Sequence, residues 1–324
     1  MGDIVHALPV VHDILAAHPG AAIDWLVEEA YADIVRAHPG VRRVIPLALR
    51  RWRRRFWADA VRREWRQWRE QLRAERYDAV IDLQGLVKSA LIAHLARGPV
   101  YGLSWASARE PLAPLFYDRR LRTAFGRTEA AVPRYRALAG WALGYAPQGE
   151  PEYGLRLDAS RPEWVAGTAR YAVLLSATAK ERKLWDEARW VGLARALSAH
   201  GRICVFAWGD AAERARAERL AAQVPQRGAA PAAQVAPQAF GLAQWMQVLR
   251  AADLVVGVDT GLLYLAAAVG TPAVAIHTGS SPHSVEFESA APWRSLGDRG
   301  KPPTIEAVLA AARSVAREPR AGSQ

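Results

Sequence analysis

The chain has 324 residues, a net charge of +11 and one cysteine, Cys204. With 51% apolar residues, it is long enough for two domains that each bury a core, which excludes a disordered chain. A lone cysteine forms no internal disulfide, so we expect Cys204 in the core of a protein from a reducing compartment. No apolar stretch reaches the ~20 residues of a membrane helix, and polar residues interrupt the first segment, unlike a signal peptide. We therefore expect a soluble, cytoplasmic protein.

In chain order, the first half alternates helix and strand signals. We expect a helix from Asp3, a strand at 23–27, a helix at 28–37, a strand at 44–45, a long helix rich in Arg and Trp, a strand at 77–83 and a helix at 86–97. Gly, Pro and polar residues at 144–152 mark a linker. The second half repeats the rhythm, with buried strands at 171–175, 203–207, 253–258 and 273–276 and a final helix at 305–317. This pattern predicts two doubly wound α/β domains, residues 1–150 and 151–324, with a cleft between them.

Most of the excess positive charge lies at residues 50–76, where eleven arginines stand against four acidic residues. Apolar residues recur there at helical spacing and predict one packed face: Trp57, Val61, Trp65, Trp68 and Leu72. Arginines interleaved with tryptophans suit nucleic acid, an anionic membrane or an acidic small substrate. A solvated Arg face over a packed Trp face explains the pattern equally well. Because no other segment resembles a base-reading module, the alternation of strands and helices favours an enzyme.

Three polar turns follow strands of the second half. Asp259-Thr260-Gly261 opens a helix at Leu262, whose free N–H groups suit an anion, although simple capping accounts for these residues too. Residues 176–185 and 208–213 follow two other strands. Because ligands bind beyond the carboxyl ends of strands in an open sheet, the three turns together predict a site for a nucleotide diphosphate. A single Asp-Thr-Gly supplies no aspartic-protease dyad.

In the first half, a helix begins at Asp3 with no strand signal before it. Capping of that helix is the simplest role for Asp3. If a strand precedes it, Asp3 instead stands on a strand-to-helix turn, where a general base belongs.

These segments in this order resemble the bacterial lipopolysaccharide heptosyltransferases of glycosyltransferase family 9, with heptosyltransferase I the nearest type. The resemblance covers nearly the whole chain. It rests on Met1-Gly2-Asp3 with Leu8-Pro9, and on segments 50–53, 77–82, 84–89, 108–112, 183–185, 208–209 and 258–262. It implies the GT-B fold and a metal-independent, inverting transfer, without a cofactor, from ADP-heptose to the Kdo of Kdo-lipid A. It also implies peripheral contact with the cytoplasmic face of the inner membrane and no nucleic-acid partner.

Residue by residue, the resemblance implies that Asp3 is the base that deprotonates the acceptor hydroxyl. Lys183 would neutralise the ADP leaving group, helped by Thr178 and by the turn at Thr260, Gly261 and Leu262. Asp259 would hold heptose hydroxyls and Glu213 the ribose, since a carboxylate accepts two hydroxyl hydrogen bonds. Phe240 would pack either on the adenine or in the core. The acidic acceptor would be bound by Gly2, Arg50, Arg51, Arg54 and Arg109.

The chain departs from the family pattern in four places. A first strand and a short loop, on the order of ten residues, are expected before Met1 and are missing. Ala179 stands where a second Thr is expected, Tyr264 replaces a His, and segment 277–282 changes its order. Three alternatives stay open. These are a transferase of the heptosyltransferase II type, a sugar-nucleotide epimerase, and a non-catalytic module that binds anions.

Overall fold

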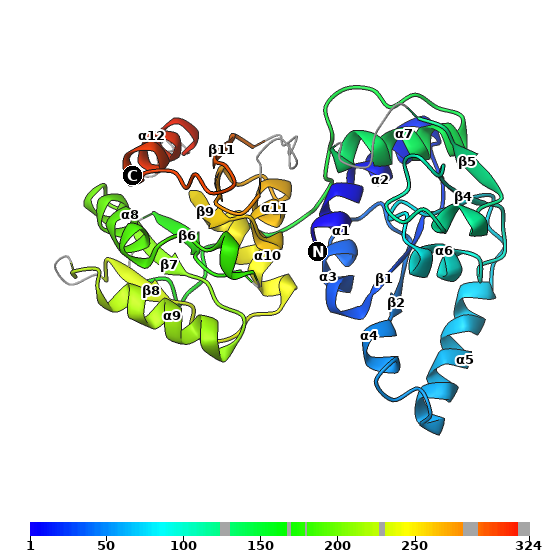
Figure 1. Ribbon diagram of the computed structural model, residues 1–324, viewed down its shortest axis with the longest axis horizontal. Helices are drawn as coiled ribbons and strands as arrows, with labels where there is room; N and C mark the ends of the chain where they lie inside the picture. Colours follow the sequence, from blue (N-terminus) through cyan, green and yellow to red (C-terminus); the bar gives the residue numbers. More distant parts are fainter. Residues whose placement is uncertain (124–129, 167–169, 179, 227–230, 281–290, 317–324) are drawn as a thin grey trace. The chain divides into compact units, whose positions relative to one another are not determined.

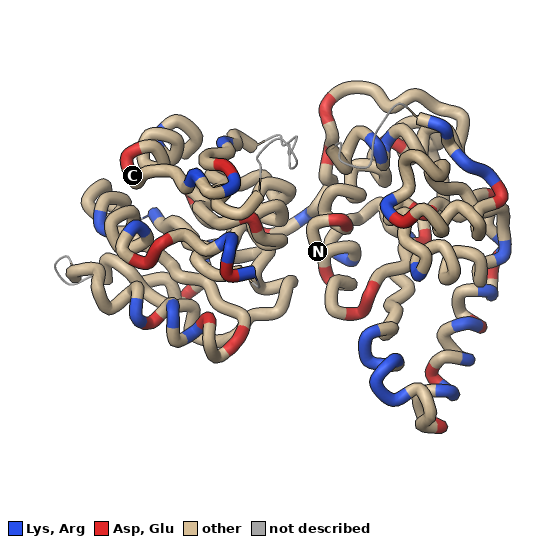
Figure 2. The backbone as a smooth tube through the Cα atoms, in the orientation of Figure 1, with Lys and Arg blue, Asp and Glu red and all other residues tan. Residues whose placement is uncertain are grey.

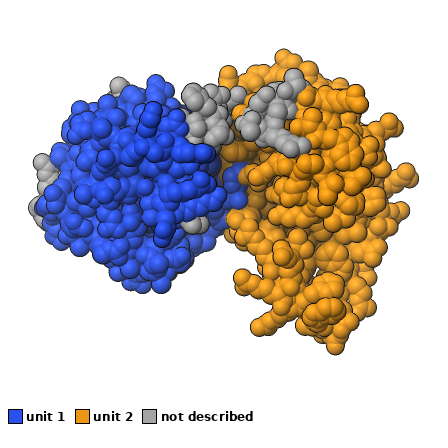
Figure 3. All heavy atoms as spheres, in the orientation of Figure 1, with its two compact units in different colours: residues 1–2, 155–324 blue, residues 3–154 orange. Residues whose placement is uncertain are grey.

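The computed structural model of the chain describes all residues except 124–129, 167–169, 179, 227–230, 281–290 and 317–324. The chain divides into two compact units (Figure 3). Residues 3–154 form the N-terminal unit, and residues 1–2 with 155–324 form the C-terminal unit. Within the described residues, no helix combines the length and the apolar character needed to cross a membrane.

The C-terminal unit is built on a six-stranded, fully parallel sheet with the order β11-β10-β9-β6-β7-β8. Its strands are β6 (Tyr171–Leu175), β7 (Ile203–Phe206), β8 (Ala233–Val235), β9 (Leu254–Val258), β10 (Ala273–His277) and β11 (Trp293–Gly297). Its helices are α8 (Glu187–Ala199), α9 (Ala211–Ala222), α10 (Leu242–Ala251), α11 (Gly261–Ala268) and α12 (Ile305–Val315), with a short 3₁₀ helix, η3 (Glu181–Lys183). Every residue of β6, β7, β9 and β10 is buried, which explains their continuous apolar runs.

The strand order of this sheet reverses between β6 and β9 (Figure 1). The chain adds β7 and β8 on one side of β6 and then continues on the other side with β9, β10 and β11. Gly257 pairs with Leu175 where the two strands meet, and a Cβ at Gly257 would lie 2.9 Å from the Cβ of Leu175. Glycine therefore permits this close pairing. A reversal of this kind is where open α/β sheets bind their ligands.

The N-terminal unit contains two separate parallel sheets, β1-β2 and β3-β4-β5. The strands are β1 (Asp24–Glu28), β2 (Arg43–Leu47), β3 (Val80–Ile81), β4 (Val100–Leu103) and β5 (Arg119–Leu121). The α-helices are α1 (Gly2–Ala7), α2 (Pro9–Ala17), α3 (Ala32–Arg36), α4 (Leu49–Trp52), α5 (Asp59–Arg73), α6 (Val87–Ala93) and α7 (Ala131–Leu143), and the 3₁₀ helices are η1 (Glu29–Tyr31) and η2 (Ala113–Phe116). Among the described residues no strand pairs β1 with β3, so the predicted doubly wound sheet is divided here.

Side chains join the two sheets of the N-terminal unit. Trp25 of β1 and Ile81 of β3 both pack against a cluster from α1, α2 and α7 that includes Val10 and Tyr135. One hydrophobic cluster therefore contacts both sheets.

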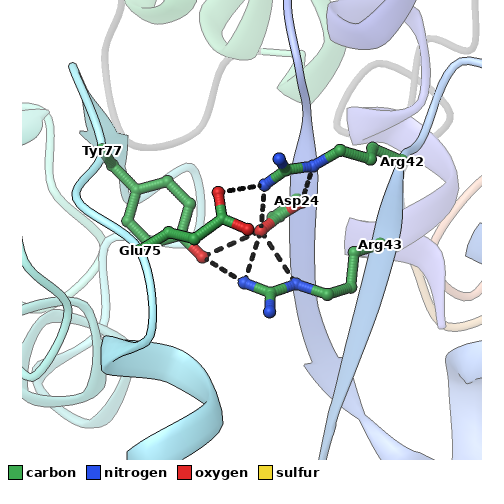
Figure 4. Close-up of polar contacts among 5 residues, drawn as sticks. All are labelled: Asp24, Arg42, Arg43, Glu75 and Tyr77. Carbon is green, nitrogen blue, oxygen red and sulfur yellow. Dashed lines mark hydrogen bonds and ion pairs between the residues drawn. The ribbon is translucent and has the colours of Figure 1, made fainter.

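A polar cluster also joins them, centred on the carboxylate of Asp24 (Figure 4). Asp24 accepts hydrogen bonds from Arg42, Arg43 and the hydroxyl of Tyr77, at 2.6–3.0 Å, and Arg42 also pairs with Glu75 at 2.7 Å. The Asp24 side chain is only 2% exposed. Burial alone would raise its pKa, but the bonds from Arg42, Tyr77 and Arg43 outweigh burial and lower it.

The region rich in Arg and Trp differs from the predicted single helix. It forms α4 and α5 with a turn between them, and basic residues gather along this hairpin (Figure 2). Val61, Trp68 and Leu72 are buried, which confirms the packed face. The prediction was wrong for Trp57, which lies in the turn and is 85% exposed.

Candidate functional site

The carboxyl ends of β6 and β9 bring together two side chains that the sequence singled out. Lys183 ends η3, after β6, and Asp259 directly follows β9. The Nζ of Lys183 lies 2.6 Å from Oδ2 of Asp259, and the two side chains are 18% and 10% exposed. The ion pair therefore sits at the reversal point of the sheet, where a ligand site is expected.

Two further side chains fix the Asp259 carboxylate. The hydroxyl of Tyr264 donates to Oδ1 at 2.8 Å, and that of Ser280 donates to Oδ2 at 2.9 Å. Burial raises the pKa of Asp259, but the bonds from Lys183, Tyr264 and Ser280 outweigh burial and bring the pKa below its usual value. Asp259 is thus an ionised acceptor at neutral pH, and Tyr264, a departure from the family pattern, serves to hold it.

The turn that begins α11 has no side-chain cap among the described residues, and the side chain of Met1 lies against Gly261. Thr260 is the N-cap residue of this helix, but its side chain makes no capping bond, and the Asp259 carboxylate is engaged elsewhere. Capping is therefore not what these side chains do. Thr260, Gly261 and Leu262 are half-buried, and the first N–H groups of α11 suit an anion.

Glu213 and Thr178 lie on the same edge of the sheet, because β7, β6 and β9 are neighbours and parallel. Oε2 of Glu213 accepts the N–H of Gly209 at 2.8 Å, while the N–H of Glu213 donates to Asp210, the N-cap of α9. Thr178 is half-buried just beyond β6. The convergence of the three predicted turns on one edge follows from the strand order.

Other predicted features of this unit have different outcomes. Phe240 is half-buried and packs against Trp164 and Trp245, at ring-centroid distances of 5.5 and 5.4 Å. Ala179 and positions 281–282 lie outside the described residues. Ser280 was not predicted to hold Asp259. The only signal was the polar turn after β10.

The N-terminal unit holds Asp3 in the first turn of α1, after Gly2 rather than at the cap. Its Oδ2 accepts from Nη1 of Arg109 at 2.8 Å and faces Nε2 of Gln84 at 3.5 Å. Burial raises the pKa of Asp3, but the charge and hydrogen bond of Arg109, with the bond from Gln84, outweigh burial and lower it. Asp3 is therefore a carboxylate with a cationic partner.

The turn that carries Gln84 is held by Asp82, which is buried. Asp82 accepts from the hydroxyl of Tyr117 at 2.7 Å, from Ser89 at 2.8 Å and from the N–H of Gln84 at 2.9 Å. Burial raises the pKa of Asp82. Segment 77–82 is part of the family pattern in the sequence, but that pattern does not predict that Asp82 holds the turn of Gln84.

Gly85, next along this turn, has a positive φ of 67°, and a Cβ there would meet the backbone N of Arg109 at 3.3 Å. A glycine therefore lets the Gln84 turn approach the segment that carries Arg109.

The other predicted acceptor residues have different surroundings. Arg51 pairs with both Glu29 and Glu64, at 3.1 and 2.6 Å. Arg50 lies over the ring of Tyr31, whereas Arg54 is exposed and makes no ion pair within the described parts of the chain. Of the four predicted acceptor arginines, Arg109 is thus the one that pairs with Asp3.

Comparison with known proteins identifies the family of this chain. The family described as Glycosyltransferase family 9 (heptosyltransferase) matches residues 65–296. A Pseudomonas aeruginosa protein named lipopolysaccharide heptosyltransferase 1 is 41% identical over 284 residues, which is 87% of this chain and 77% of that protein. The solved structure of E. coli heptosyltransferase WaaC with ADP has a TM-score of 0.87 and 36% identity, over 98% of this chain and 97% of its own. A second WaaC structure, with ADP-2-deoxy-2-fluoro heptose, has a TM-score of 0.82 and 36% identity over the same shares of the two chains.

These matches favour a transferase over the epimerase alternative, and the fold agrees with the predicted GT-B architecture. The chain belongs to glycosyltransferase family 9, the heptosyltransferases.

Proposed function

We propose that this enzyme transfers the heptose of ADP-L-glycero-D-manno-heptose to a Kdo hydroxyl of Kdo-lipid A, in the assembly of the lipopolysaccharide inner core. The observation that carries the proposal is the pair of Lys183 and Asp259 at the reversal point of the C-terminal sheet. The names of the relatives support type I rather than type II, and the ADP and ADP-heptose analogue bound in WaaC support the donor.

For the donor, Lys183 supplies positive charge to the diphosphate as the bond between the sugar and ADP breaks. A charge-assisted hydrogen bond of this kind is stronger than a neutral one. The N–H groups of Thr260 and Gly261 add further donors at the start of α11. Asp259 accepts hydrogen bonds from heptose hydroxyls, and Glu213 accepts those of the ribose.

For the acceptor, Asp3 takes the proton of the attacking Kdo hydroxyl. The oxygen forms its bond to the anomeric carbon from the side opposite to ADP, the bond from that carbon to the phosphate oxygen breaks, and the configuration inverts. Proton transfer to a positioned carboxylate contributes ~10²–10⁴ to the rate. Arg109 keeps Asp3 ionised and, with Arg54, offers guanidinium donors to acceptor carboxylates and phosphates. We further propose that the enzyme works in the cytoplasm, against the inner membrane that holds this acceptor.

The test is a transfer assay with purified protein, ADP-heptose and Kdo-lipid A, with no metal added. We expect ADP release in step with a mass increase of one heptose on the acceptor, and an anomeric configuration opposite to that of the donor. Reactions without acceptor, and with GDP-mannose as donor, are the controls. Release of ADP without a modified acceptor would contradict the proposed acceptor. ADP binding without any turnover would favour a non-catalytic module.

A further inference from the structure

The turn between α4 and α5 carries two aromatic side chains at its corner. The N–H of Ala58 donates to the carbonyl of Arg55 at 3.0 Å, which places Phe56 and Trp57 at the two central positions of a four-residue turn. Such positions ordinarily hold Gly, Pro, Asn or Asp. Phe56 is 52% and Trp57 85% exposed. Adjacent aromatic rings left in water indicate a surface that a partner covers.

The turn is held in place from both sides. Nη2 of Arg62 donates to the carbonyl of Trp57 at 3.2 Å and to Asp59 at 3.0 Å. At the base of the hairpin, Trp52, Trp65 and Trp68 pack on one another with ring centroids 5.0–5.8 Å apart. The exposed rings of Phe56 and Trp57 therefore lie on a hairpin that is held by the Arg62 hydrogen bonds and by the packed tryptophans at its base.

Three arginines stand directly before the aromatic pair. Arg53, Arg54 and Arg55 are all exposed, and within the described residues none of them makes an ion pair. Further basic residues lie along both arms of the hairpin (Figure 2). Residues 53–57, hereafter the tip, thus combine three unneutralised cations with two exposed rings. Each Arg near an anionic lipid surface adds to binding, and Trp favours the boundary between headgroups and acyl chains.

We propose that the tip anchors the protein to a bilayer that contains anionic phospholipid, with Phe56 and Trp57 inserted among the headgroups and the arginines on lipid phosphates. The shape of the tip favours lipid over single-stranded nucleic acid, because such nucleic acids stack on aromatic platforms inside a basic groove, whereas these rings stand on a turn. This inference rests on the proposed function, because a membrane anchor serves an enzyme whose acceptor is a lipid.

Vesicle binding tests the anchor. Vesicles of phosphatidylethanolamine with phosphatidylglycerol should bind the protein in a salt-dependent way, and vesicles of phosphatidylcholine alone should bind it weakly. The double variant Phe56→Ala/Trp57→Ala should bind at least ~10-fold more weakly, with an unchanged melting temperature because both side chains are exposed. The matched control, Leu112→Ala/Leu115→Ala, removes two other exposed apolar side chains of the same unit and should bind like the wild type.

The charges of the tip are tested by a second pair of variants. Arg53→Gln/Arg55→Gln should weaken binding to anionic vesicles on the order of 10-fold and flatten its salt dependence. Arg66→Gln/Arg69→Gln removes the same charge from exposed positions farther along α5 and should have a smaller effect. Equal effects of the two variants would assign binding to the net charge of the unit and overturn the anchor.

Insertion has its own readout. Vesicles with brominated acyl chains should quench the fluorescence of Trp57, obtained as the difference between wild type and Trp57→Phe. The Trp57→Phe variant should keep its vesicle binding, because Phe is also apolar and aromatic. Absence of quenching, or undiminished vesicle binding by Phe56→Ala/Trp57→Ala, would overturn the proposal. So would wild-type protein that binds single-stranded RNA but no vesicles.

A deacylated, water-soluble Kdo acceptor separates the anchor from the proposed function. Phe56→Ala/Trp57→Ala should transfer heptose to this acceptor like the wild type and should lose efficiency only on acceptor held in vesicles. Loss on the soluble acceptor would place Phe56 and Trp57 in the acceptor site and overturn the anchor. Wild-type protein that binds vesicles but transfers no heptose would contradict the proposed function while supporting the anchor.

Discussion

At the scale of single residues, the two candidate carboxylates, Asp3 and Asp259, both have a cationic partner and a lowered pKa. Their surroundings differ in what they leave for a substrate. Asp259 has Lys183, Tyr264 and Ser280 around it and suits a fixed acceptor of hydroxyl groups. Asp3 has one strong partner and a side chain 42% exposed, which suits a group that must meet an incoming hydroxyl.

Replacing Asp3 by Asn tests the base. The amide keeps the shape of the side chain but does not take up a proton, so kcat should fall ~10²–10⁴-fold with ADP affinity unchanged. Asp33→Asn is a matched control, since Asp33 is an exposed partner of Arg36 at the surface. Turnover within a few-fold of wild type in Asp3→Asn would show that Asp3 is not the base.

Arg109→Gln should move the acid limb of the rate profile. The Arg109 charge lowers the pKa of Asp3 against the opposing effect of burial, so its removal raises that pKa. The fall of kcat on acidification should then begin at higher pH than in the wild type. The measurement is kcat against pH for both proteins. An unmoved acid limb would mean that the group seen in the profile is not Asp3.

Lys183→Met should weaken ADP binding by ~10–100-fold, because the diphosphate loses a bond worth roughly 1.5–3 kcal/mol. It also leaves Asp259 without its cation and should lower the melting temperature. The double variant Lys183→Met/Asp259→Asn removes both charges, so it should regain stability but not ADP affinity. Calorimetric titration and melting curves of both proteins separate the two effects. Recovered ADP binding in the double variant would make Lys183 purely structural.

At the scale of elements, apolar runs predicted the strands β6, β7, β9 and β10 because these are buried on both faces. The edge strands β8 and β11 were not predicted, since half-buried residues give no continuous run. Periodicity also did not separate the turn at Trp57 from the first turn of α5. Gln84 and Ser280, which contact Asp3 and Asp259, lie in turns. Their contacts are made with segments far away in the sequence, so no local sequence pattern predicts them.

The Asp24 cluster should govern the acid stability of the N-terminal unit. Asp24 has a lowered pKa in the folded state, so its contribution is present above the ordinary aspartate pKa of ~3.9 and is lost as pH falls through the folded value. Asp24→Asn should reduce the free energy of unfolding by roughly 1–3 kcal/mol near neutral pH, with a weaker dependence on pH below ~4 than the wild type. Urea titrations at several pH values measure both.

Asp59→Asn is the control for the Asp24 variant, because its pair with Arg62 is exposed and surface pairs contribute little. Equal losses of stability in the two variants at neutral pH would show that the Asp24 cluster contributes no more to stability than an exposed ion pair does.

At the scale of the whole molecule, the two compact units have their own sheets and clusters of buried residues. The residues proposed to bind the donor all belong to the C-terminal unit. A ligand stabilises what it binds, so ADP at ~100 times its Kd should stabilise this unit by about 2.7 kcal/mol. Differential scanning calorimetry should show two transitions, of which ADP moves only one. A single transition that shifts as a whole would mean that the units unfold together.

The position of Cys204 has a practical consequence for such measurements. It is the single cysteine of the chain and lies buried in β7, where burial raises the pKa of its thiol to about 12. Alkylation needs an accessible thiolate, so a reagent should modify this position only when the C-terminal unit opens. The rate of Cys204 labelling then measures how often the C-terminal unit opens. Labelling as a function of temperature assigns a thermal transition to that unit without an engineered probe.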